Sequence, residues 1–392
     1  MRAANDSAAN SHPHGEPTST DGSAICFFGT YERKRVARIS VLLEGLRAHG
    51  HMVYECNAPL GLTHEEKLKL LKKPWRVLSL VSHLSRSWTR LWQSSKSLPP
   101  PDFVLVPYMG HFDILLAKLR FRSTPIMLDH MIFAADTARD RRAPSFIASL
   151  FHLLDWVALT LADVIILDTP EHQALVPSRL RHRSVVVPIG VPKAWLLPES
   201  SIPIAAKDPA ILRIIFFGLF TPLQGIETIA KSFLRLKECN TPFSVTMVGH
   251  GQDYQLARQL LGSLGGIDWI DWLDEADLIA AVKRHQVCLG IFGASQKSKR
   301  VVPQKLFLGA AAGCVVVTSD TLPQRRVFSE IAHYVPSEDA NALAETLAAL
   351  AHDLKALEQQ RVATRAYAKE FFSPVSATST LNQKIKSMRT TA

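Results

Sequence analysis

The chain has 392 residues, of which 47% are hydrophobic and 20% charged, a composition typical of a folded protein and unlike that of a disordered chain or a coiled coil. This length favours two domains of roughly 150 to 200 residues each. The formal net charge of +10 indicates an anionic partner, and charge alone does not distinguish phosphate groups, a membrane surface and nucleic acid.

Residues 1–22 are rich in small and polar residues and lack the apolar run of a signal-peptide core, so we predict a disordered tail there. The five cysteines are scattered and lie in or beside apolar runs, without the close spacing of a metal site. Reduced core cysteines of this kind indicate the cytosol.

Residues 23–190 contain six short apolar runs, separated for the most part by helical patterns. The strands predicted from these runs are residues 24–28, 52–56, 103–106, 126–128, 164–167 and 184–187. The longest apolar stretch, Phe146 to Leu167, is long enough to span a bilayer, but His152, Asp155 and Asp163 would be costly in lipid. We therefore predict a buried helix followed by a strand.

Residues 208–372 repeat this organisation. The strands predicted there are residues 212–217, 243–248, 267–270, 287–289, 314–318 and 333–335. Helical patterns between them include residues 225–237, 274–284 and 340–370. The proline-rich stretch between the halves breaks both helix and strand, so we predict a linker at residues 191–207.

The alternation of strands and helices predicts an α/β protein with two Rossmann-like, doubly wound parallel-sheet domains that face a cleft. Residues 23–190 would form the first domain and residues 208–372 the second. The helical stretch at 373–392 is longer than the second sheet needs, and we expect it to cross back to the first domain.

Glycines follow two neighbouring strands of the second half. Gly218 and Gly225 flank the turn after strand 212–217, and Gly249 and Gly251 follow strand 243–248. Glycines at such turns let backbone N–H groups approach a phosphate, helped by the positive end of the next helix. An ordinary strand-to-helix turn is the alternative. Without a Walker lysine or a full G-x-G-x-x-G, the P-loop ATPase and dehydrogenase classes are disfavoured.

A cationic loop follows strand 287–289. It carries Lys297 and Arg300 and leads into a helix at Pro303, with Lys305 in its first turn. These three cations can together neutralise a diphosphate leaving group. A solvated basic loop is the alternative.

Two polar residues of the first half lie near the carboxyl ends of predicted strands, where doubly wound sheets bind ligands. His111 follows strand 103–106, and Asp129 follows strand 126–128. We predict that both side chains face the cleft, where a carboxylate such as Asp129 can bind ligand hydroxyls or serve as a base. A histidine at a helix start and a structural aspartate are the alternatives.

The segment at residues 64–96 combines many cations with Trp75, Trp88 and Trp92 near helical spacing. A basic helix of this kind is suited to lying on an anionic membrane. Alternatively, its apolar stripe packs on the first sheet and its cations form a solvated face.

Taken together, these features resemble the family-4-type glycosyltransferases of the GT-B fold. The segments that carry the resemblance are Gly29-Thr30-Tyr31, residues 187–191, Pro222 to Gly225, Val248 to Gly251 and Gly290 to Thr318. They span nearly the whole chain after the tail, and their combination and order are specific.

The resemblance implies a retaining, metal-independent enzyme without a cofactor, which moves a sugar from a UDP- or GDP-sugar to a glycan or lipid-linked acceptor. It implies a role in surface polysaccharide or glycolipid biosynthesis, in the cytoplasm or on the inner face of the cell membrane. Its candidate catalytic residues are His111, Asp129, Lys297 and Arg300. The resemblance implies that His111 acts near the transferred sugar or the acceptor hydroxyl and that Asp129 binds acceptor hydroxyls or serves as a base. Its candidate donor-binding residues are Gly29, Thr30, Gly218, Gln224, Gly225, Gly249, Gly251, Lys297, Arg300, Lys305 and Glu330.

The chain also departs from the family pattern. Many relatives have two glutamates separated by seven residues, where this chain has Gly290 or Ile291 and Leu308. Gln224 replaces a usual lysine, and Arg326 stands near a usual acid, with Glu330 as a substitute candidate. Two other functions therefore stay open: a non-catalytic nucleotide-sugar-binding regulatory module and a sugar-nucleotide epimerase. Nucleic-acid binding is disfavoured because no recognition module is present.

Overall fold

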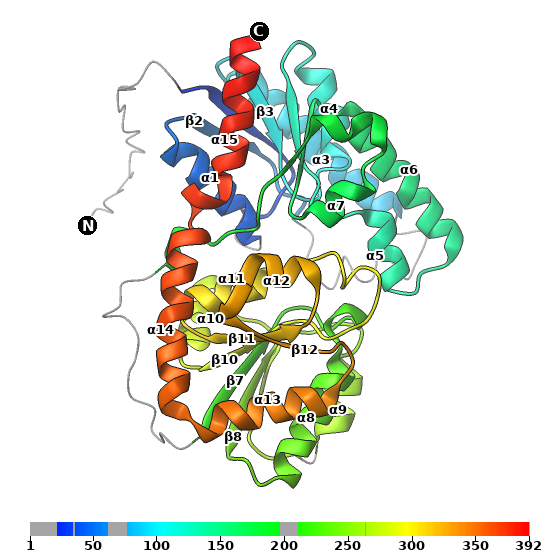
Figure 1. The fold of residues 1–392 in the computed structure, drawn as a ribbon. Coiled ribbons are helices and arrows are strands. Elements are labelled where there is room, and N and C mark those ends of the chain that lie inside the picture. The colour runs from blue at the N-terminus through cyan, green and yellow to red at the C-terminus, as the bar shows by residue number, and fades with distance from the viewer. Residues whose placement is uncertain (1–21, 34–35, 62–76, 197–210, 263, 392) are drawn as a thin grey trace, which may run out of the picture.

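The computed structural model describes residues 22–33, 36–61, 77–196, 211–262 and 264–391. These form two domains, each a parallel six-stranded sheet flanked by helices (Figure 1). The strand order is β2-β1-β3-β4-β5-β6 in the first sheet and β12-β11-β10-β7-β8-β9 in the second. The predicted α/β class with two Rossmann-like domains is confirmed.

All twelve predicted strands are present, and each end lies within one residue of its predicted place. The first sheet contains β1 (Ala24–Gly29), β2 (Met52–Asn57), β3 (Phe103–Val106), β4 (Ile126–Asp129), β5 (Val164–Leu167) and β6 (Ser184–Val186). The second contains β7 (Leu212–Phe217), β8 (Phe243–Val248), β9 (Ile267–Ile270), β10 (Val287–Leu289), β11 (Val315–Ser319) and β12 (Ala332–Val335). Strands buried on both faces, such as β3, β4 and β5, read as continuous apolar runs.

The helices of the first domain are α1 (Ala37–Ala48), α3 (Val77–Lys96), α4 (Asp113–Arg120), α5 (Ala134–Asp140), α6 (Ser145–Leu161) and α7 (Pro170–Leu175). The second half contains α8 (Ile226–Glu238), α9 (Tyr254–Leu261), α10 (Glu275–Lys283), α11 (Gln304–Ala311), α12 (Leu322–Phe328), α13 (Ala340–His352), α14 (Leu354–Phe371) and α15 (Pro374–Thr391). The single helical stretch predicted at 340–370 is two helices, because Asp353 ends α13 and its carboxylate caps α14 by accepting from Ala356 N.

The last helix, α15, leaves the second domain and packs against α1 of the first (Figure 1). Gly45 makes this close packing possible, since a Cβ there would lie 2.2 Å from Thr378 Oγ1. Beside the crossing, Val191 N donates to Phe372 O at 2.8 Å. The two segments that connect the domains therefore lie next to each other. Residues 197–210 of the predicted linker lie outside the described residues, as do residues 1–21 of the predicted tail.

The prediction that the apolar helix before β5 is buried is wrong. In α6, the side chains of Phe146, Leu150 and Leu153 are 74%, 64% and 54% exposed, whereas Asp155 is buried. The apolar run favoured a core position, yet only one edge of α6 packs on the domain. None of the described helices has the length and apolar character needed to cross a membrane.

Candidate active site

The segments that follow strands in the two sheets meet at the domain boundary. Helix α5 follows β4, and it contacts the cationic loop that follows β10. Three side-chain pairs make this contact: Arg300 with Asp136, Lys297 Nζ with Thr137 Oγ1 at 2.9 Å, and Ser295 Oγ with Asp140 Oδ1 at 2.7 Å. The carboxyl ends of the two sheets thus face each other, as they do in proteins that bind ligands between doubly wound domains.

A second bridge joins α7 to α12. Arg326 donates two hydrogen bonds to the Glu171 carboxylate, at 3.0 and 2.6 Å. Thr169 Oγ1, just before α7, donates to Arg300 O at 2.8 Å. Arg326, which stands near the place of a family acid, therefore holds the two domains together in this structure.

Three loops of the second domain are packed together through glycines. A Cβ at Gly249 would lie 2.0 Å from Gly218 O, and one at Gly225 would lie 2.5 Å from the Phe292 carbonyl carbon. A Cβ at Gly251 would lie 2.5 Å from Phe220 O. Gly218, Gly225 and Gly249 also have φ angles of +133°, +67° and +126°, which residues with a Cβ rarely adopt. Loop packing alone accounts for these glycines, so their contact with a donor stays a prediction.

Lys305 lies beneath this glycine turn. Its side chain is buried, and its Nζ donates to Gln224 Oε1 and lies 3.6 Å from the centroid of the Phe216 ring. A Cβ built on Gly218 would lie 3.6 Å from the same Nζ. Among the described residues, no carboxylate is within ion-pair distance of Lys305. Burial lowers the pKa of Lys305 to about 7. The turn therefore holds a cation that lacks a counterion, which is a favourable place for an anion.

Lys297 and Arg300 have different surroundings from Lys305. Their side chains bind α5 of the other domain, through Thr137 and Asp136. Burial lowers the pKa of Lys297, although Asp140 and Asp136 oppose the effect. The structure thus brings one of the three predicted cations to the glycine turns, and a role in binding the diphosphate stays a prediction for all three.

The positions of the missing family glutamates have no place for a carboxylate. A Cβ at Gly290 would lie 2.1 Å from Thr318 Oγ1, and Leu308 is buried in the hydrophobic core of the second domain. The substitute candidate, Glu330, is exposed on the short helix η7 (Ser329–Ile331) beside the edge strand β12. Its contact with a donor stays a prediction.

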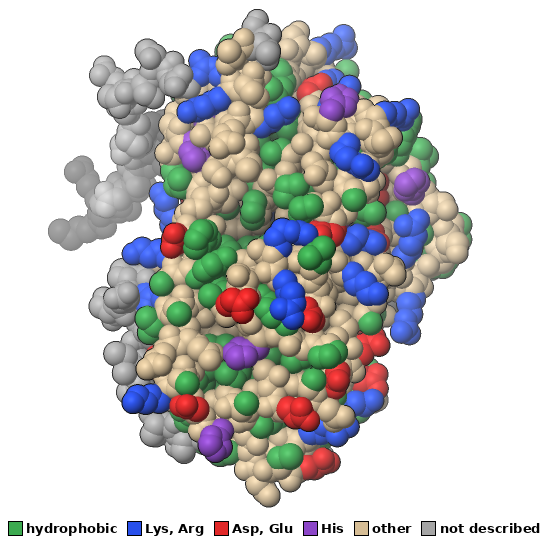
Figure 2. All heavy atoms as spheres, viewed as in Figure 1, with side chains coloured by type: hydrophobic (Ala, Val, Ile, Leu, Met, Phe, Trp, Pro, Cys, Tyr) green, Lys and Arg blue, Asp and Glu red, His purple; other side chains and the backbone are tan. Residues whose placement is uncertain are grey.

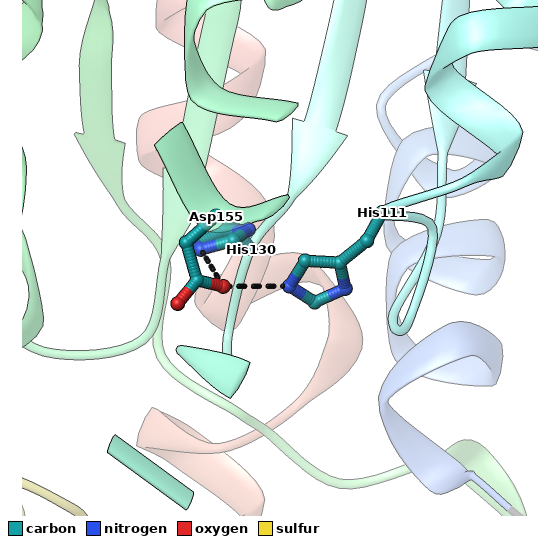
Figure 3. Close-up of side chains that lie close together, drawn as sticks. All are labelled: His111, His130 and Asp155. Carbon is teal, nitrogen blue, oxygen red and sulfur yellow. Dashed lines mark hydrogen bonds and ion pairs between the residues drawn. The ribbon is translucent and has the colours of Figure 1, made fainter. Parts of the chain in front are cut away.

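Two histidines and an aspartate meet at the carboxyl ends of β3 and β4 (Figure 3). His111 follows β3, His130 follows β4, and Asp155 reaches them from α6. His111 Nε2 lies 3.0 Å from Asp155 Oδ1, and His130 Nε2 lies 3.6 Å from the same oxygen. Asp155 also accepts hydrogen bonds from the backbone N–H groups of Ala134 and Ala135. One carboxylate therefore orients His111 and the start of α5, the helix that binds the cationic loop.

The three side chains differ in their electrostatics. Burial alone would raise the pKa of Asp155, but hydrogen bonds from His111 and from two backbone N–H groups lower it overall. Burial lowers the pKa of His130 to about 3, so its imidazole is neutral at physiological pH. Neither ring nitrogen of His130 has a hydrogen-bond partner among the described residues. A buried polar group without a partner is a candidate for binding a ligand hydroxyl.

Sequence reasoning missed His130. The residue directly follows Asp129 at the end of a predicted strand, and the same positional rule had selected His111 and Asp129. Applying that rule to every polar side chain at a strand end would have included it.

His111, His130 and Asp155 could also hold a metal ion, since their ligand atoms all lie within 4.8 Å of one another. Imidazole nitrogens and a carboxylate oxygen are suitable ligands for zinc. His111 and Asp155 already satisfy each other by a hydrogen bond, so the cluster does not require an ion. The prediction that the site has no metal stays a prediction.

Asp129 is engaged by Arg38 of α1. Arg38 Nη2 lies 3.1 Å from Asp129 Oδ1, both side chains are fully buried, and Arg38 also donates to Val187 O at 2.9 Å. Burial raises the pKa of Asp129, whereas Arg38 opposes that rise. The pair links α1, β4 and the start of the interdomain segment, which favours the structural alternative over the predicted acid-base role.

The loop after β1 is fixed from within its own domain. Thr30 donates to Asp113 Oδ2 through its backbone N at 2.7 Å and its hydroxyl at 2.8 Å. Trp88 Nε1 donates to the other oxygen of Asp113 at 2.9 Å, and a Cβ at Gly29 would lie 2.9 Å from the same side chain. Donor binding by Gly29 and Thr30 stays a prediction.

In the described part of α3, the tryptophans are turned toward the protein. Trp88 and Trp92 are partly buried against the core of the first domain. This supports packing on the sheet, the alternative to membrane contact. Residues 64–76, with Trp75 and several of the cations, lie outside the described residues.

A separate hollow of about 510 Å³ lies in the second domain, near the amino ends of β7 and β8. It is at the opposite edge of the sheet from the glycine turns. His285 in its lining is already bound by Ala281 O and Thr246 Oγ1. The hollow is therefore not part of the site at the domain boundary.

Two parallel six-stranded sheets that face each other through their carboxyl ends define the GT-B class of fold. Sucrose-phosphate synthase from Thermosynechococcus elongatus superposes with a TM-score of 0.70, at 13% identity over 94% of this chain and 99% of that one. HepE of Anabaena, solved with UDP and glucose, superposes with a TM-score of 0.64, at 12% identity over 94% of this chain and 100% of that one. The resemblance to GT-B glycosyltransferases is confirmed at the level of the fold.

The sequence comparisons concern part of the chain. Residues 233–375 match a family model described as glycosyl transferase-like. Phosphatidyl-myo-inositol mannosyltransferase of Mycobacterium leprae is 31% identical over 156 residues, which cover 38% of this chain and 40% of that protein. The aligned segment thus spans about two fifths of that relative, and the family match lies in the second half of the chain.

Proposed function

We propose that this chain is a glycosyltransferase that moves a sugar from a nucleotide-sugar to a glycan or lipid-linked acceptor. The observation that carries the proposal is Lys305, a buried cation without a counterion beneath the Gly218 turn. Two of the similar proteins agree with it, since one is a mannosyltransferase by name and the other was solved with UDP and glucose. The missing family glutamates keep the regulatory module and the epimerase open, and the contacts described above add nothing in favour of either.

The donor is a UDP- or GDP-sugar whose diphosphate lies at the Gly218 turn. As the bond between the sugar and the phosphate breaks, negative charge grows on the departing diphosphate. Lys305 and the backbone N–H groups of the turn stabilise that charge. Gln224, which accepts from Lys305 Nζ, positions the ammonium group. Lys297 and Arg300 would join the diphosphate only by leaving their partners on α5.

The transferred sugar faces the histidines of the first domain. A neutral His130 has one nitrogen to donate and one to accept, so it suits a sugar hydroxyl. His111 is oriented by Asp155. The centroids of the His111 and His130 rings are 4.8 Å apart. Since Gly290 and Leu308 leave no room for the family glutamates, we assign the main sugar contacts to this cluster.

The reaction retains the anomeric configuration and requires no metal or cofactor. The acceptor hydroxyl attacks the anomeric carbon from the side on which the diphosphate leaves. The new glycosidic bond forms as the bond to phosphate breaks, and the hydroxyl proton passes to the departing phosphate oxygen. The chain works in the cytoplasm or on the inner face of the cell membrane, in surface polysaccharide or glycolipid synthesis. The aligned mannosyltransferase, named for a phosphatidyl lipid, supports a lipid-linked acceptor.

Titrating the full chain with nucleoside diphosphates and their sugar conjugates in a calorimeter tests the donor class. We expect selective binding of one nucleoside diphosphate, slow release of it from the matching sugar conjugate, and the same rate in EDTA. Binding of no nucleotide would contradict the proposal. Tight binding without release in the presence of any acceptor would instead support a regulatory module.

A further inference from the structure

Helix α6 presents an apolar face to the outside of the first domain, at the right of the view in Figure 1. The exposed positions along this face are Phe146, Ser149, Leu150, Leu153, Trp156 and Thr160, with His152 exposed at its edge. All lie in the described part of the chain and none is charged. Their spacing of three or four residues places them on one side of the helix.

The opposite face of α6 carries the only charged residue of the helix. Asp155 is buried and binds His111, and its neighbours on that face are Ala148, Ala158 and Leu159. A surface helix of a globular protein normally has its charges outside and its large apolar residues inside. The reversed arrangement marks the outer face as a contact surface.

Helix α4 contacts α6 and also exposes apolar side chains. Leu115 and Leu119 lie on the helix and Phe112 directly precedes it, again at a spacing of three or four. Two neighbouring helices therefore expose large apolar side chains on the same domain.

Arginines surround the apolar surface. Arg139, Arg141 and Arg142 precede α6 and are exposed, and Arg122 follows α4. The guanidinium of Arg179 lies 5.7 Å from the centroid of the Trp156 ring. Figure 2 shows Lys and Arg side chains along this side of the upper domain.

Only some of the acidic residues near the arginines are paired with cations. Asp136 binds Arg300 and Asp163 binds Lys118, whereas Asp140 binds the neutral Ser295 hydroxyl and Asp253 interacts electrostatically with Arg142. The charge around the apolar surface is still positive, which complements an anionic partner. Five exposed arginines outnumber Asp140 and Asp253 there: Arg122, Arg139, Arg141, Arg142 and Arg179.

We propose that the outer faces of α6 and α4 dock on an anionic lipid bilayer, with Phe146, Leu150, Leu153 and Trp156 in the boundary between headgroups and acyl chains. Apolar and aromatic side chains with arginines beside them suit that boundary. A second copy of the chain is a poorer occupant, because a symmetric contact would bring the arginines of one copy against those of the other.

The docking surface differs from the segment at 64–96, whose described tryptophans face the core. It also lies next to the proposed site, since Asp155 connects α6 to His111. The inference stands on the exposed face and its charges, and it needs no transfer reaction.

Sedimentation of the full chain with phosphatidylglycerol-containing vesicles, and with pure phosphatidylcholine vesicles, tests the inference. We expect binding to the anionic vesicles only, weakened by salt. The triple variant Phe146→Gln, Leu150→Gln and Leu153→Gln should lose binding by about tenfold or more. Its matched control, Met52→Gln, Trp272→Gln and Val362→Gln, changes three other side chains that are more than half exposed and should bind like the wild type.

Quenching of tryptophan fluorescence by lipids with brominated acyl chains gives a second measurement on milder variants. We expect quenching in the wild type, less of it in Trp156→Phe, and no such decrease in Trp272→Phe. Absence of wild-type binding, or equal binding and quenching in all variants, would overturn the inference. A dimer of the free chain that only the α6 triple variant abolishes would assign the surface to a second copy. Nucleotide binding, measured in parallel without vesicles, reports separately on the proposed function.

Discussion

The two sides of the domain boundary differ in how their charges are balanced. On the first domain, three buried aspartates have polar partners within their own domain. Asp113 binds Thr30 and Trp88, Asp129 binds Arg38, and Asp155 binds His111. On the second domain, glycine loops surround Lys305, which has a neutral amide as its partner. The first side is therefore held by its own polar contacts, whereas Lys305 on the second side has no counterion among the described residues. Under the proposed function, the second domain would supply the binding energy for the diphosphate and the first would orient the sugar.

Replacing Lys305 tests the second side and should have the largest effect. We expect Lys305→Met to lower nucleoside diphosphate affinity by about 100-fold or more, because the turn loses its cation. The same change should raise the melting temperature by several degrees, because it removes a buried charge without a counterion. Calorimetric titration and thermal unfolding measure the two effects. Lower stability together with unchanged affinity would remove Lys305 from the site.

Replacing Asp155 tests the first side. Asp155→Asn keeps an acceptor for the N–H groups of α5 but weakens the orientation of His111. We expect transfer to slow by about 10- to 100-fold while donor affinity stays the same. Asp277→Asn, at an exposed carboxylate on α10, is the matched control. If Asp155→Asn lowered donor affinity as much as it slowed transfer, the first domain would also contribute to donor binding.

The pH dependence of donor affinity tests whether Lys305 of the second domain binds the donor. A bound anion restores the pKa of Lys305 toward its ordinary value, so binding above pH 7 must take up a proton. We expect affinity to fall by up to about tenfold per pH unit from pH 7 to 9. Calorimetry in buffers of different ionisation enthalpy should detect the proton, and Lys305→Met should not show it.

The lowered pKa of Lys305 also predicts how the free energy of unfolding depends on pH. The unfolded chain keeps the Lys305 proton up to pH about 10, whereas the folded chain keeps it only to about pH 7. Unfolding between these values takes up a proton, so the free energy of unfolding contributed by Lys305 rises with pH across this window. Denaturant titrations of wild type and Lys305→Met at several pH values compare the two slopes, and identical slopes would contradict the assigned pKa.

Releasing Arg300 from Asp136 should change donor affinity by the smallest amount among these tests. Asp136→Asn removes the carboxylate that binds Arg300 in this structure. If Arg300 reaches the diphosphate in the working enzyme, donor affinity should rise by about threefold, because less is lost in leaving α5. Titration of Asp136→Asn, alone and combined with Arg300→Ala, measures this. No gain in the single variant, and no loss in the combined one, would leave Arg300 as a domain bridge.

The strands could be predicted closely because buried parallel strands leave continuous apolar runs such as Val164–Leu167. Helix α6 was predicted as a helix, but its exposure could not be predicted, because an apolar helix that faces outward has the same composition as one that is buried. The three cations lie close in sequence, but the chain turns between Arg300 and Lys305, so they reach different domains. The pairing of Asp129 with Arg38 joins residues that are 91 positions apart, and one sequence carries no pattern for it.

The hydrogen bond from Val191 to Phe372 places both interdomain connections side by side. Two adjacent connections would favour rotation of the lobes about a nearby axis over twisting. In Figure 1, α5 lies on the side of the domain boundary opposite the crossing from α14 to α15. If the lobes rotated about that crossing, the contact of Arg300 with Asp136 would separate and a ligand would enter from the α5 side.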